Sequence, residues 1–130
     1  MVFAHGAACA HGCRPATNVN HRITAQSTTE YVNAAHGLRL YYEIVGDGPQ
    51  AVLVPGGLYY RDDFRRLAQG RTLIFYDLRN RGFSDAVGDP GLLAGGIHND
   101  VEDLEAIHLH FGIDAIARIG HSYVGLTVVL

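Results

Sequence analysis

The sequence AIARIGHSYVG, residues 115–125, joins a short apolar run to a serine that lies between two glycines. The run has no regular polar alternation, as in strands that are covered on both faces of a parallel sheet. The apolar segment LTVVL follows, so Ser122 lies where a predicted strand ends. A serine on a sharp strand-to-helix turn has a strained backbone and projects its hydroxyl above the sheet, and the N–H of the next residue, Tyr123, lies at a helix N-terminus. The stretch is a candidate nucleophile elbow, with the Tyr123 N–H as an oxyanion donor.

Two further apolar runs have the same character, AVLVP at 51–55 and TLIFYD at 72–77. Directly after the first comes a glycine turn that can aim a backbone N–H into a crevice. We expect Gly57 to supply this N–H, with Leu58 as the neighbouring possibility. A tight turn that serves only chain reversal is the alternative. Because ligands of open α/β sheets bind outside the carboxyl ends of the strands, Gly57 and Ser122 are predicted to share one site.

The remaining patterns indicate an α/β fold. The β-prone runs at 28–32 and 38–45 are separated by a turn-like AAHG, which predicts an antiparallel pair. Apolar residues recur at helical spacing over 61–70 and 100–111. The order strand, strand, strand, helix, strand, helix, strand predicts an α/β sheet, in which parallel strands with right-handed crossover helices follow an antiparallel N-terminal edge.

Local signals frame the second helix. Asn99 and Glu102 are spaced as a capping box, and Gly112 is placed as a stop signal after the last turn. The Gly-rich segment FSDAVGDPGLLAGGI at 83–97 is predicted to be a loop near a binding cleft.

Composition narrows the class of protein. The chain has 130 residues, 48% of them hydrophobic, and a formal net charge of −3, which fits one globular domain. Its ten basic residues are all arginines and are scattered along the chain, which argues against nucleic acid as a partner. No stretch approaches the roughly 18 uninterrupted apolar residues that cross a bilayer, and the first residues lack the features of a secretory signal. We therefore expect a cytoplasmic protein without a membrane partner.

Residues 1–26 contain no acidic group and show no helical or strand periodicity, which predicts a disordered leader before a domain over 27–130. Both cysteines, Cys9 and Cys13, lie in this leader near three histidines: His5, His11 and His21. Their spacing fits no closed structural zinc motif, so no metal site is predicted, and zinc binding by the leader stays open as an alternative.

Several motifs, in their order along residues 28–130, resemble the α/β-hydrolase superfamily, and most of all its esterase and prolyl-iminopeptidase-like members. The motifs that carry the resemblance are LYYEIVGDGP (40–49), VLVPGG (52–57), FYDLRNRGFSD (75–85), DLEAIHLHFGI (103–113) and GHSYVG (120–125).

This resemblance implies a serine hydrolase that acts on an ester or a small peptide-like amide and needs no cofactor. It implies that Ser122 is the acylated nucleophile and that the N–H groups of Tyr123 and Gly57 form the oxyanion hole. Residues 77–85 are similar to the family's D-x-R-G-x-G-x-S turn, with Asn80 in place of a glycine, and we interpret them as a structural turn.

The sequence also departs from the family pattern. Pro55 stands where a histidine is common, and the glycine expected two residues after the nucleophile is displaced to Gly125. In the family the triad acid and histidine follow the nucleophile, whereas this sequence stops at Leu130. We therefore expect the N-terminal part of a hydrolase domain, truncated after the nucleophile strand and nearly inactive alone.

Upstream histidines are not expected to replace the missing base. His121 adjoins Ser122 but should point to the opposite face of the strand and be buried, and the loop positions of His36 and His98 are not fixed by the sequence. The second hypothesis is a non-catalytic fragment whose open sheet edge, beyond the nucleophile strand, is covered by a partner or by self-association.

Overall fold

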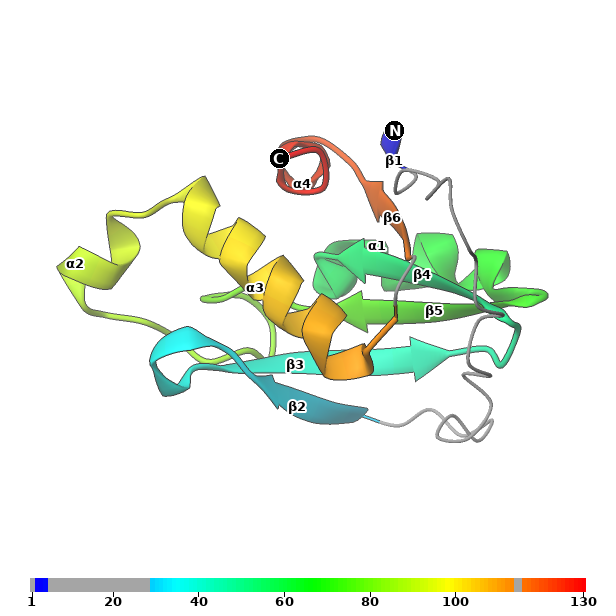
Figure 1. Ribbon diagram of the computed structural model, residues 1–130, viewed down its shortest axis with the longest axis horizontal. Coiled ribbons are helices and arrows are strands. Elements are labelled where there is room, and N and C mark those ends of the chain that lie inside the picture. Colours follow the sequence, from blue (N-terminus) through cyan, green and yellow to red (C-terminus); the bar gives the residue numbers. More distant parts are fainter. Residues whose placement is uncertain (1, 5–28, 114–115) are drawn as a thin grey trace, which may run out of the picture.

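The computed structural model describes residues 2–4, 29–113 and 116–130. Its elements, in chain order, are β1 (Val2–Ala4), β2 (Thr29–Asn33), the 3-10 turn η2 (Ala35–Gly37), β3 (Arg39–Val45), β4 (Gln50–Pro55), α1 (Gly57–Phe64), the 3-10 turn η3 (Arg65–Ala68), β5 (Arg71–Tyr76), α2 (Pro90–Leu93), α3 (Ile97–Phe111), β6 (Ala117–Gly120) and α4 (Tyr123–Thr127). Figure 1 shows the strands side by side as one sheet.

The sheet has the order β1-β6-β4-β5-β3-β2. Its centre is parallel, with β4 between β5 and β6, and its edge is antiparallel, with β3 against β5 and β2 against β3. This arrangement confirms the predicted α/β fold. Because β4, β5 and β6 run in one direction, the turns that follow them meet at one edge of the sheet.

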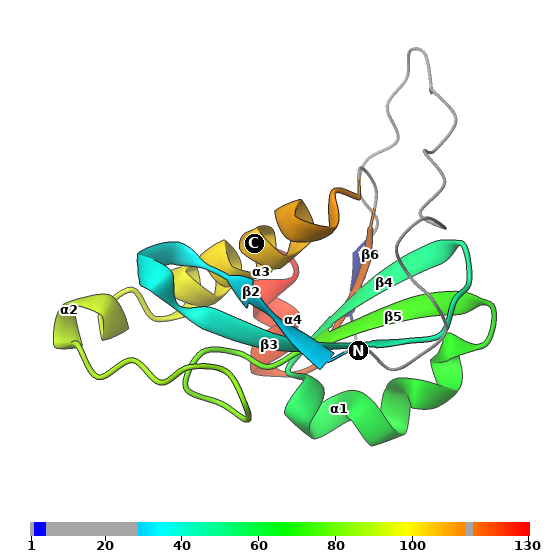
Figure 2. The ribbon, with the colours of Figure 1, turned by 90° about the horizontal axis from the view of Figure 1, so that it is seen from below.

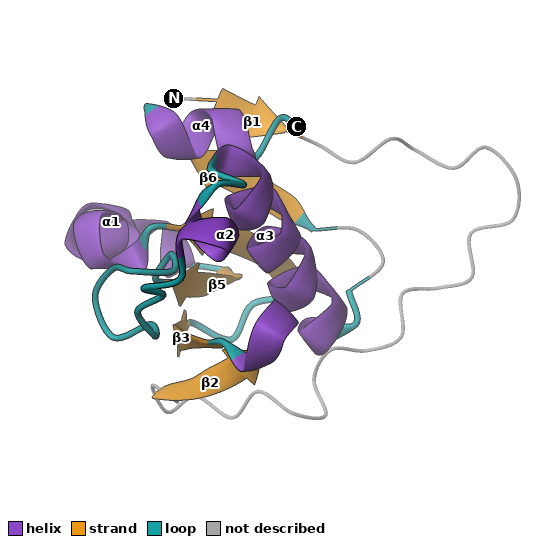
Figure 3. Cartoon of the chain, turned by 90° about the vertical axis from the view of Figure 1, so that its left-hand side faces the viewer, coloured by secondary structure: helices purple, strands orange, loops and turns teal. Residues whose placement is uncertain are grey.

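Alternate residues of the central strands fill two cores. Leu53 and Ile74 face the core under α3, together with Leu104, whereas Val54 and Phe75 face the core over α1. Figures 2 and 3 show α1 and α3 on opposite sides of the sheet. Burial on both faces explains why these strands read as continuous apolar runs.

The first predicted helix is shifted in the structure. It was expected over 61–70, but α1 starts at Gly57, directly after β4, and ends at Phe64, where η3 continues the turn. Gly56 has φ 75° and ψ 39°, and this left-handed conformation reverses the chain within one residue. A helix that starts without a capping side chain leaves little signal in the sequence.

The predicted capping box is wrong. Helix α3 begins at Ile97 after Gly96, so Asn99 lies inside the first turn and its amide donates to the carbonyl of Leu92. Gly96 has φ 53°, which lets the chain enter the helix without a side-chain cap. The stop signal is confirmed, because Gly112 ends the helix with φ 58°.

The loop predicted at 83–97 contains the short helix α2. Asp89 caps it by accepting hydrogen bonds from the N–H groups of Gly91 and Leu92, and Pro90 takes the first helical position.

The leader predicted over 1–26 lies largely outside the described residues. Its residues Val2–Ala4 form β1, which pairs antiparallel with β6, so that Phe3 lies opposite Ile119. The sequence predicts an open edge at β6, and the structure differs there because this strand supplies the missing pairing.

Candidate active site

Ser122 lies on a strained turn between β6 and α4. Its backbone has φ 57° and ψ −131°, a conformation that side-chain-bearing residues rarely adopt. The N–H of Gly125 donates to the Ser122 carbonyl at 2.9 Å and closes the turn. The serine side chain is exposed at the carboxyl end of β6, as expected for a strand–nucleophile–helix turn.

Glycines allow α4 to approach β6 closely. A Cβ on Gly120 would lie 2.6 Å from the carbonyl oxygen of Val124 and 2.9 Å from the Cα of Gly125. Gly125, rather than the residue before it, therefore provides the small surface opposite Gly120. Val124 is buried, and its side chain lies where a Cβ on Gly56 would be only 3.4 Å away. Val124 therefore packs close to the glycine turn, at the position where the family usually has glycine.

The glycine turn reaches the elbow, but its donors are not equivalent. The N–H of Leu58 donates to Asp77 Oδ1 at 2.7 Å, which removes it from the possible oxyanion donors. No hydrogen bond engages the N–H of Gly57 or of Tyr123 among the described residues. Gly57 is buried, with its Cα facing Phe75 and Asp77, and it does not line the cavity described below. Tyr123 and Ser122 do line it.

The carboxylate of Asp77 links the glycine turn to the loop over 80–85. Besides the N–H of Leu58, it accepts the N–H of Phe83 at 3.1 Å, and the Asp77 carbonyl accepts the Ser84 hydroxyl at 2.6 Å. Asp77 is fully buried. These bonds give the segment a structural role, as the sequence analysis predicted.

Asn80 occupies a glycine position of that turn with φ 60°. Asparagine tolerates this conformation better than most residues. Its side-chain oxygen also accepts the N–H of Val87, which ties the loop to the segment before α2.

A buried ion pair joins the loop to α3. Arg79 Nε lies 2.7 Å from Asp103 Oδ2, and Arg79 Nη2 lies 2.8 Å from Oδ1, while Nη2 also donates to the carbonyl of Asn99. Asp103 is fully buried and Arg79 nearly so. The hydrogen bonds to Asp103 raise the pKa of Arg79, so the guanidinium stays charged.

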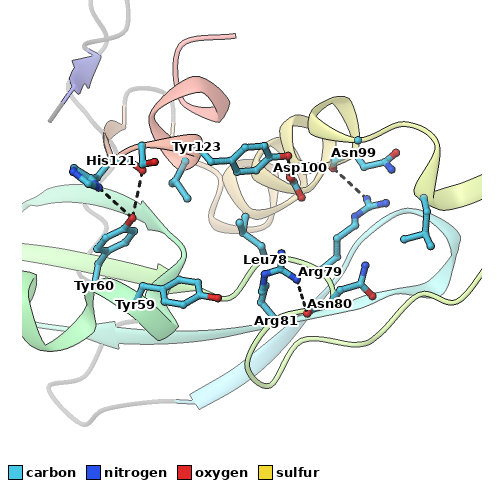
Figure 4. A pocket seen from close by; sticks show the side chains of 14 residues that line it. Tyr59, Tyr60, Leu78, Arg79, Asn80, Arg81, Asn99, Asp100, His121 and Tyr123 are labelled. Atoms are coloured by element: carbon cyan, nitrogen blue, oxygen red, sulfur yellow. Dashed lines mark hydrogen bonds between the residues drawn. The ribbon is translucent and has the colours of Figure 1, made fainter.

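A cavity of about 380 Å³ opens beside Ser122 (Figure 4). Its walls come from α1, the loop that follows β5, the start of α3 and the elbow. The lining residues are Tyr59, Tyr60, Leu78, Arg79, Asn80, Arg81, Leu93, Gly96, Asn99, Asp100, His121, Ser122, Tyr123 and Val124. Leu93 and Gly96 belong to the segment predicted to lie near a binding cleft.

Asp100 and Tyr123 form a hydrogen-bonded pair in the cavity wall. The Tyr123 hydroxyl donates to Asp100 Oδ2 at 2.6 Å. Burial raises the pKa of Asp100, and the bond from Tyr123 opposes this shift. Burial, together with the bond to Asp100, raises the pKa of Tyr123 to about 12. The sequence analysis missed this pair because no motif links residues 23 positions apart.

The predicted burial of His121 is wrong. Its side chain is exposed, and its ring lies edge-on to Tyr60, with Nδ1 3.5 Å from the tyrosine hydroxyl. Strand β6 ends at Gly120, so the alternation of faces along a strand does not extend to His121. His36 lines a separate cavity and His98 lies in the first turn of α3.

Within the described part of the chain, no hydrogen bond joins the Ser122 hydroxyl to a histidine or a carboxylate. Over the same residues, no group of three or more histidine, cysteine or acidic side chains could hold a metal ion. The His and Cys cluster of the leader, considered above for zinc, lies outside them. No described helix combines the length and apolarity that crossing a membrane requires.

Solved structures share this fold. An α/β hydrolase from Novosphingobium aromaticivorans is 28% identical and matches 81% of this chain with a TM-score of 0.68. An epoxide hydrolase from Vigna radiata (19%, TM-score 0.66) and an esterase from Exiguobacterium antarcticum (20%, TM-score 0.67) each match 78% of it. The chain spans 39%, 34% and 38% of these three proteins, respectively. No protein-family model and no curated protein matches the sequence.

The chain therefore has the fold of the α/β hydrolases and corresponds to their N-terminal part. The likeness to the epoxide hydrolase and the esterase, both below 25% identity, shows the fold alone.

Proposed function

We propose that this chain carries the nucleophile and the oxyanion hole of a serine hydrolase that acts on an ester or a small peptide-like amide. One observation supports this above all: Ser122 lies exposed at the carboxyl end of β6 with φ 57° and ψ −131°, on the wall of a cavity. This backbone conformation costs on the order of 1–3 kcal/mol, and such strain clusters at functional sites.

In the proposed reaction, the Ser122 hydroxyl attacks the substrate carbonyl and loses its proton to a base. The tetrahedral intermediate then breaks its bond to the alcohol or amine, which leaves with that proton, and water hydrolyses the remaining acyl-enzyme. The negative charge that develops on the carbonyl oxygen is stabilised by the N–H groups of Tyr123 and Gly57. Both groups are without partners among the described residues, whereas the alternative donor, the Leu58 N–H, is bonded to Asp77. Of the two, Tyr123 lines the cavity and Gly57 lies behind its wall.

The proposal needs an acid and a histidine that the described residues do not present to Ser122. In the family that the sequence resembles, both follow the nucleophile along the chain. We propose that the 130 residues alone are nearly inactive, because a serine hydroxyl without its base is a weak nucleophile.

A fluorophosphonate probe tests the nucleophile without requiring turnover. Imidazole is added to replace the missing histidine, and covalent labelling is followed by intact mass and peptide mapping. We expect imidazole-dependent phosphonylation of Ser122, abolished in Ser122→Ala and retained in the matched variant Ser27→Ala. Equal labelling of Ser122→Ala and the unmodified protein would show that Ser122 is not the nucleophile.

A further inference from the structure

We propose that Arg81 binds a carboxylate on the substrate, so that the site selects esters or amides that carry a free carboxylate group. The proposal rests on the proposed function only in taking Ser122 as the reacting group. Arg81 and Ser122 line the same cavity of about 380 Å³, Arg81 from the loop after β5 and Ser122 from the elbow.

The loop holds the backbone of Arg81 in place. The Arg81 N–H donates to the carbonyl of Leu78, and the Arg81 carbonyl accepts the N–H of Ser84, both at 3.1 Å. Asp77 and the positive φ of Asn80 fix the loop further. The guanidinium therefore extends from a backbone that is already ordered, which lowers the entropy cost of binding a ligand.

Arg81 forms no ion pair with a carboxylate of the described residues. Five arginines in the described part of the chain have a carboxylate within 4.0 Å: Arg39, Arg61, Arg65, Arg79 and Arg118. Arg81 has no such partner among the described residues, and its one hydrogen bond is from Nη1 to the carbonyl of Asn80. The remaining N–H donors of its guanidinium are free to bind an anion.

Asp100, the acidic residue that shares the cavity, does not form an ion pair with Arg81. Its carboxylate accepts the Tyr123 hydroxyl and has no Arg81 nitrogen within 4.0 Å; burial raises the pKa of Asp100, and the charge of Arg81, which acts on it at longer range, opposes this rise. Figure 4 shows Tyr123 and Asp100 on one side of the cavity and Arg81 with Tyr59 on the other.

The geometry of a guanidinium suits a carboxylate. Its parallel N–H groups match the two oxygens of a carboxylate in a bidentate pair. Of the two arginines that line the cavity, Arg79 is paired with Asp103, so Arg81 offers one positive charge to match the single charge of a carboxylate.

The test compares two probes of one shape, 4-fluorophenylacetate and the neutral 4-fluorophenylacetamide, by fluorine NMR titration of the 130-residue chain. We expect the acid to bind at least about tenfold more tightly than the amide, as for a hydrogen bond to a charged group. Arg81→Gln should remove this preference and leave amide binding unchanged, so that the amide also reports on folding. Arg81→Lys, which keeps the charge without the planar fork, should retain part of it.

Arg66→Gln is the matched control, because Arg66 is exposed on η3 and has no acidic partner among the described residues. Equal loss in Arg66→Gln and Arg81→Gln, no preference for the acid, or no binding of the acid at millimolar concentration would each overturn the proposal. Tighter, Arg81-dependent binding of 4-fluorobenzylphosphonate would overturn the choice of a carboxylate. All titrations are repeated in Ser122→Ala, so that a failure of the nucleophile assignment leaves the result for Arg81 separate.

Discussion

The backbone of Ser122 places its hydroxyl at the cavity and does so at a cost. With φ 57° and ψ −131° it occupies a region that only glycine visits freely. The surrounding contacts enforce this conformation: Gly120 packs against the start of α4, and Val124 packs against Gly56. The local fold is therefore expected to be more stable when residue 122 has no side chain.

We predict that Ser122→Gly unfolds at a higher urea concentration than Ser122→Ala, by about 1 kcal/mol in the free energy of unfolding. Both substitutions remove the hydroxyl, but only glycine relieves the strain, less the entropy that glycine adds to the unfolded chain. Urea unfolding followed by circular dichroism measures the difference. If the alanine variant were the more stable, the turn would not be strained.

The surroundings of Ser122 show which features of the site can be predicted from the sequence. The position of Ser122 on a turn at the end of β6 was predictable, because it follows from a local pattern, G-x-S after an apolar run. The exposure of His121 and the pairing of Tyr123 with Asp100 depend on which helix packs beside the elbow, and neither follows from neighbouring letters. The roles of Ser122, Tyr123 and Gly57 remain predictions.

Between elements, the Arg79–Asp103 pair attaches α3 to the loop after β5. Breaking such a buried pair leaves an uncompensated charge, which costs about 3–5 kcal/mol. We predict that Arg79→Met and Asp103→Asn each lower the free energy of unfolding by about 3 kcal/mol and that the double variant loses less than the sum. Chemical denaturation measures all three.

Arg39→Met is the matched control, because it breaks the exposed pair with Asp85. It should cause a far smaller loss, since exposed pairs are screened by solvent. Similar losses from Arg39→Met and Arg79→Met would contradict a special role for the buried pair.

Asp100 should make stability depend on pH. Its pKa is raised by burial, so near pH 4 and above the folded state keeps a proton that the unfolded state has lost, and stability falls as the pH rises through this window. Asp85 acts in the opposite sense, because its bonds to Arg39 lower its pKa, so its contribution is lost only at lower pH.

We therefore predict that Asp100→Asn, which can still accept the Tyr123 hydroxyl, flattens the decline in stability as the pH rises above about 4. Denaturant titrations at a series of pH values compare this variant with the unmodified chain. Parallel profiles for the two proteins would rule out Asp100 as the source of the decline.

The strands were predictable to within a few residues, because burial on both faces gives β4 and β5 continuous apolar runs. The first residues of the helices were not predictable in this way. Both α1 and α3 begin after glycines with positive φ, and in neither does a side chain cap the first turn. A rule based on capping side chains therefore places these starts too late.

For the molecule as a whole, β1 is the feature that sequence patterns did not predict. It pairs with β6 and covers the edge that would otherwise expose unpaired backbone groups. Antiparallel pairing between residues 2–4 and 118–120 joins distant parts of the chain, and three residues carry too little periodicity to reveal it.

We predict that Phe3→Pro, which removes a backbone N–H from β1, increases self-association of the chain through the edge of β6. Sedimentation velocity over a range of concentrations measures this, with Thr17→Pro as the control for introducing a proline. An unchanged monomer in Phe3→Pro would show that β1 is not needed to protect the edge.

The hydrogen bonds of Asp77 have a consequence for engineering. The Asp77 carboxylate accepts hydrogen bonds both from the first turn of α1 and from the loop over 80–85, so these two walls of the cavity are joined through one side chain. Exchanging that loop for one from another enzyme would also shift the N-terminus of α1. Libraries that aim to change substrate preference should vary both walls together and leave residue 77 untouched.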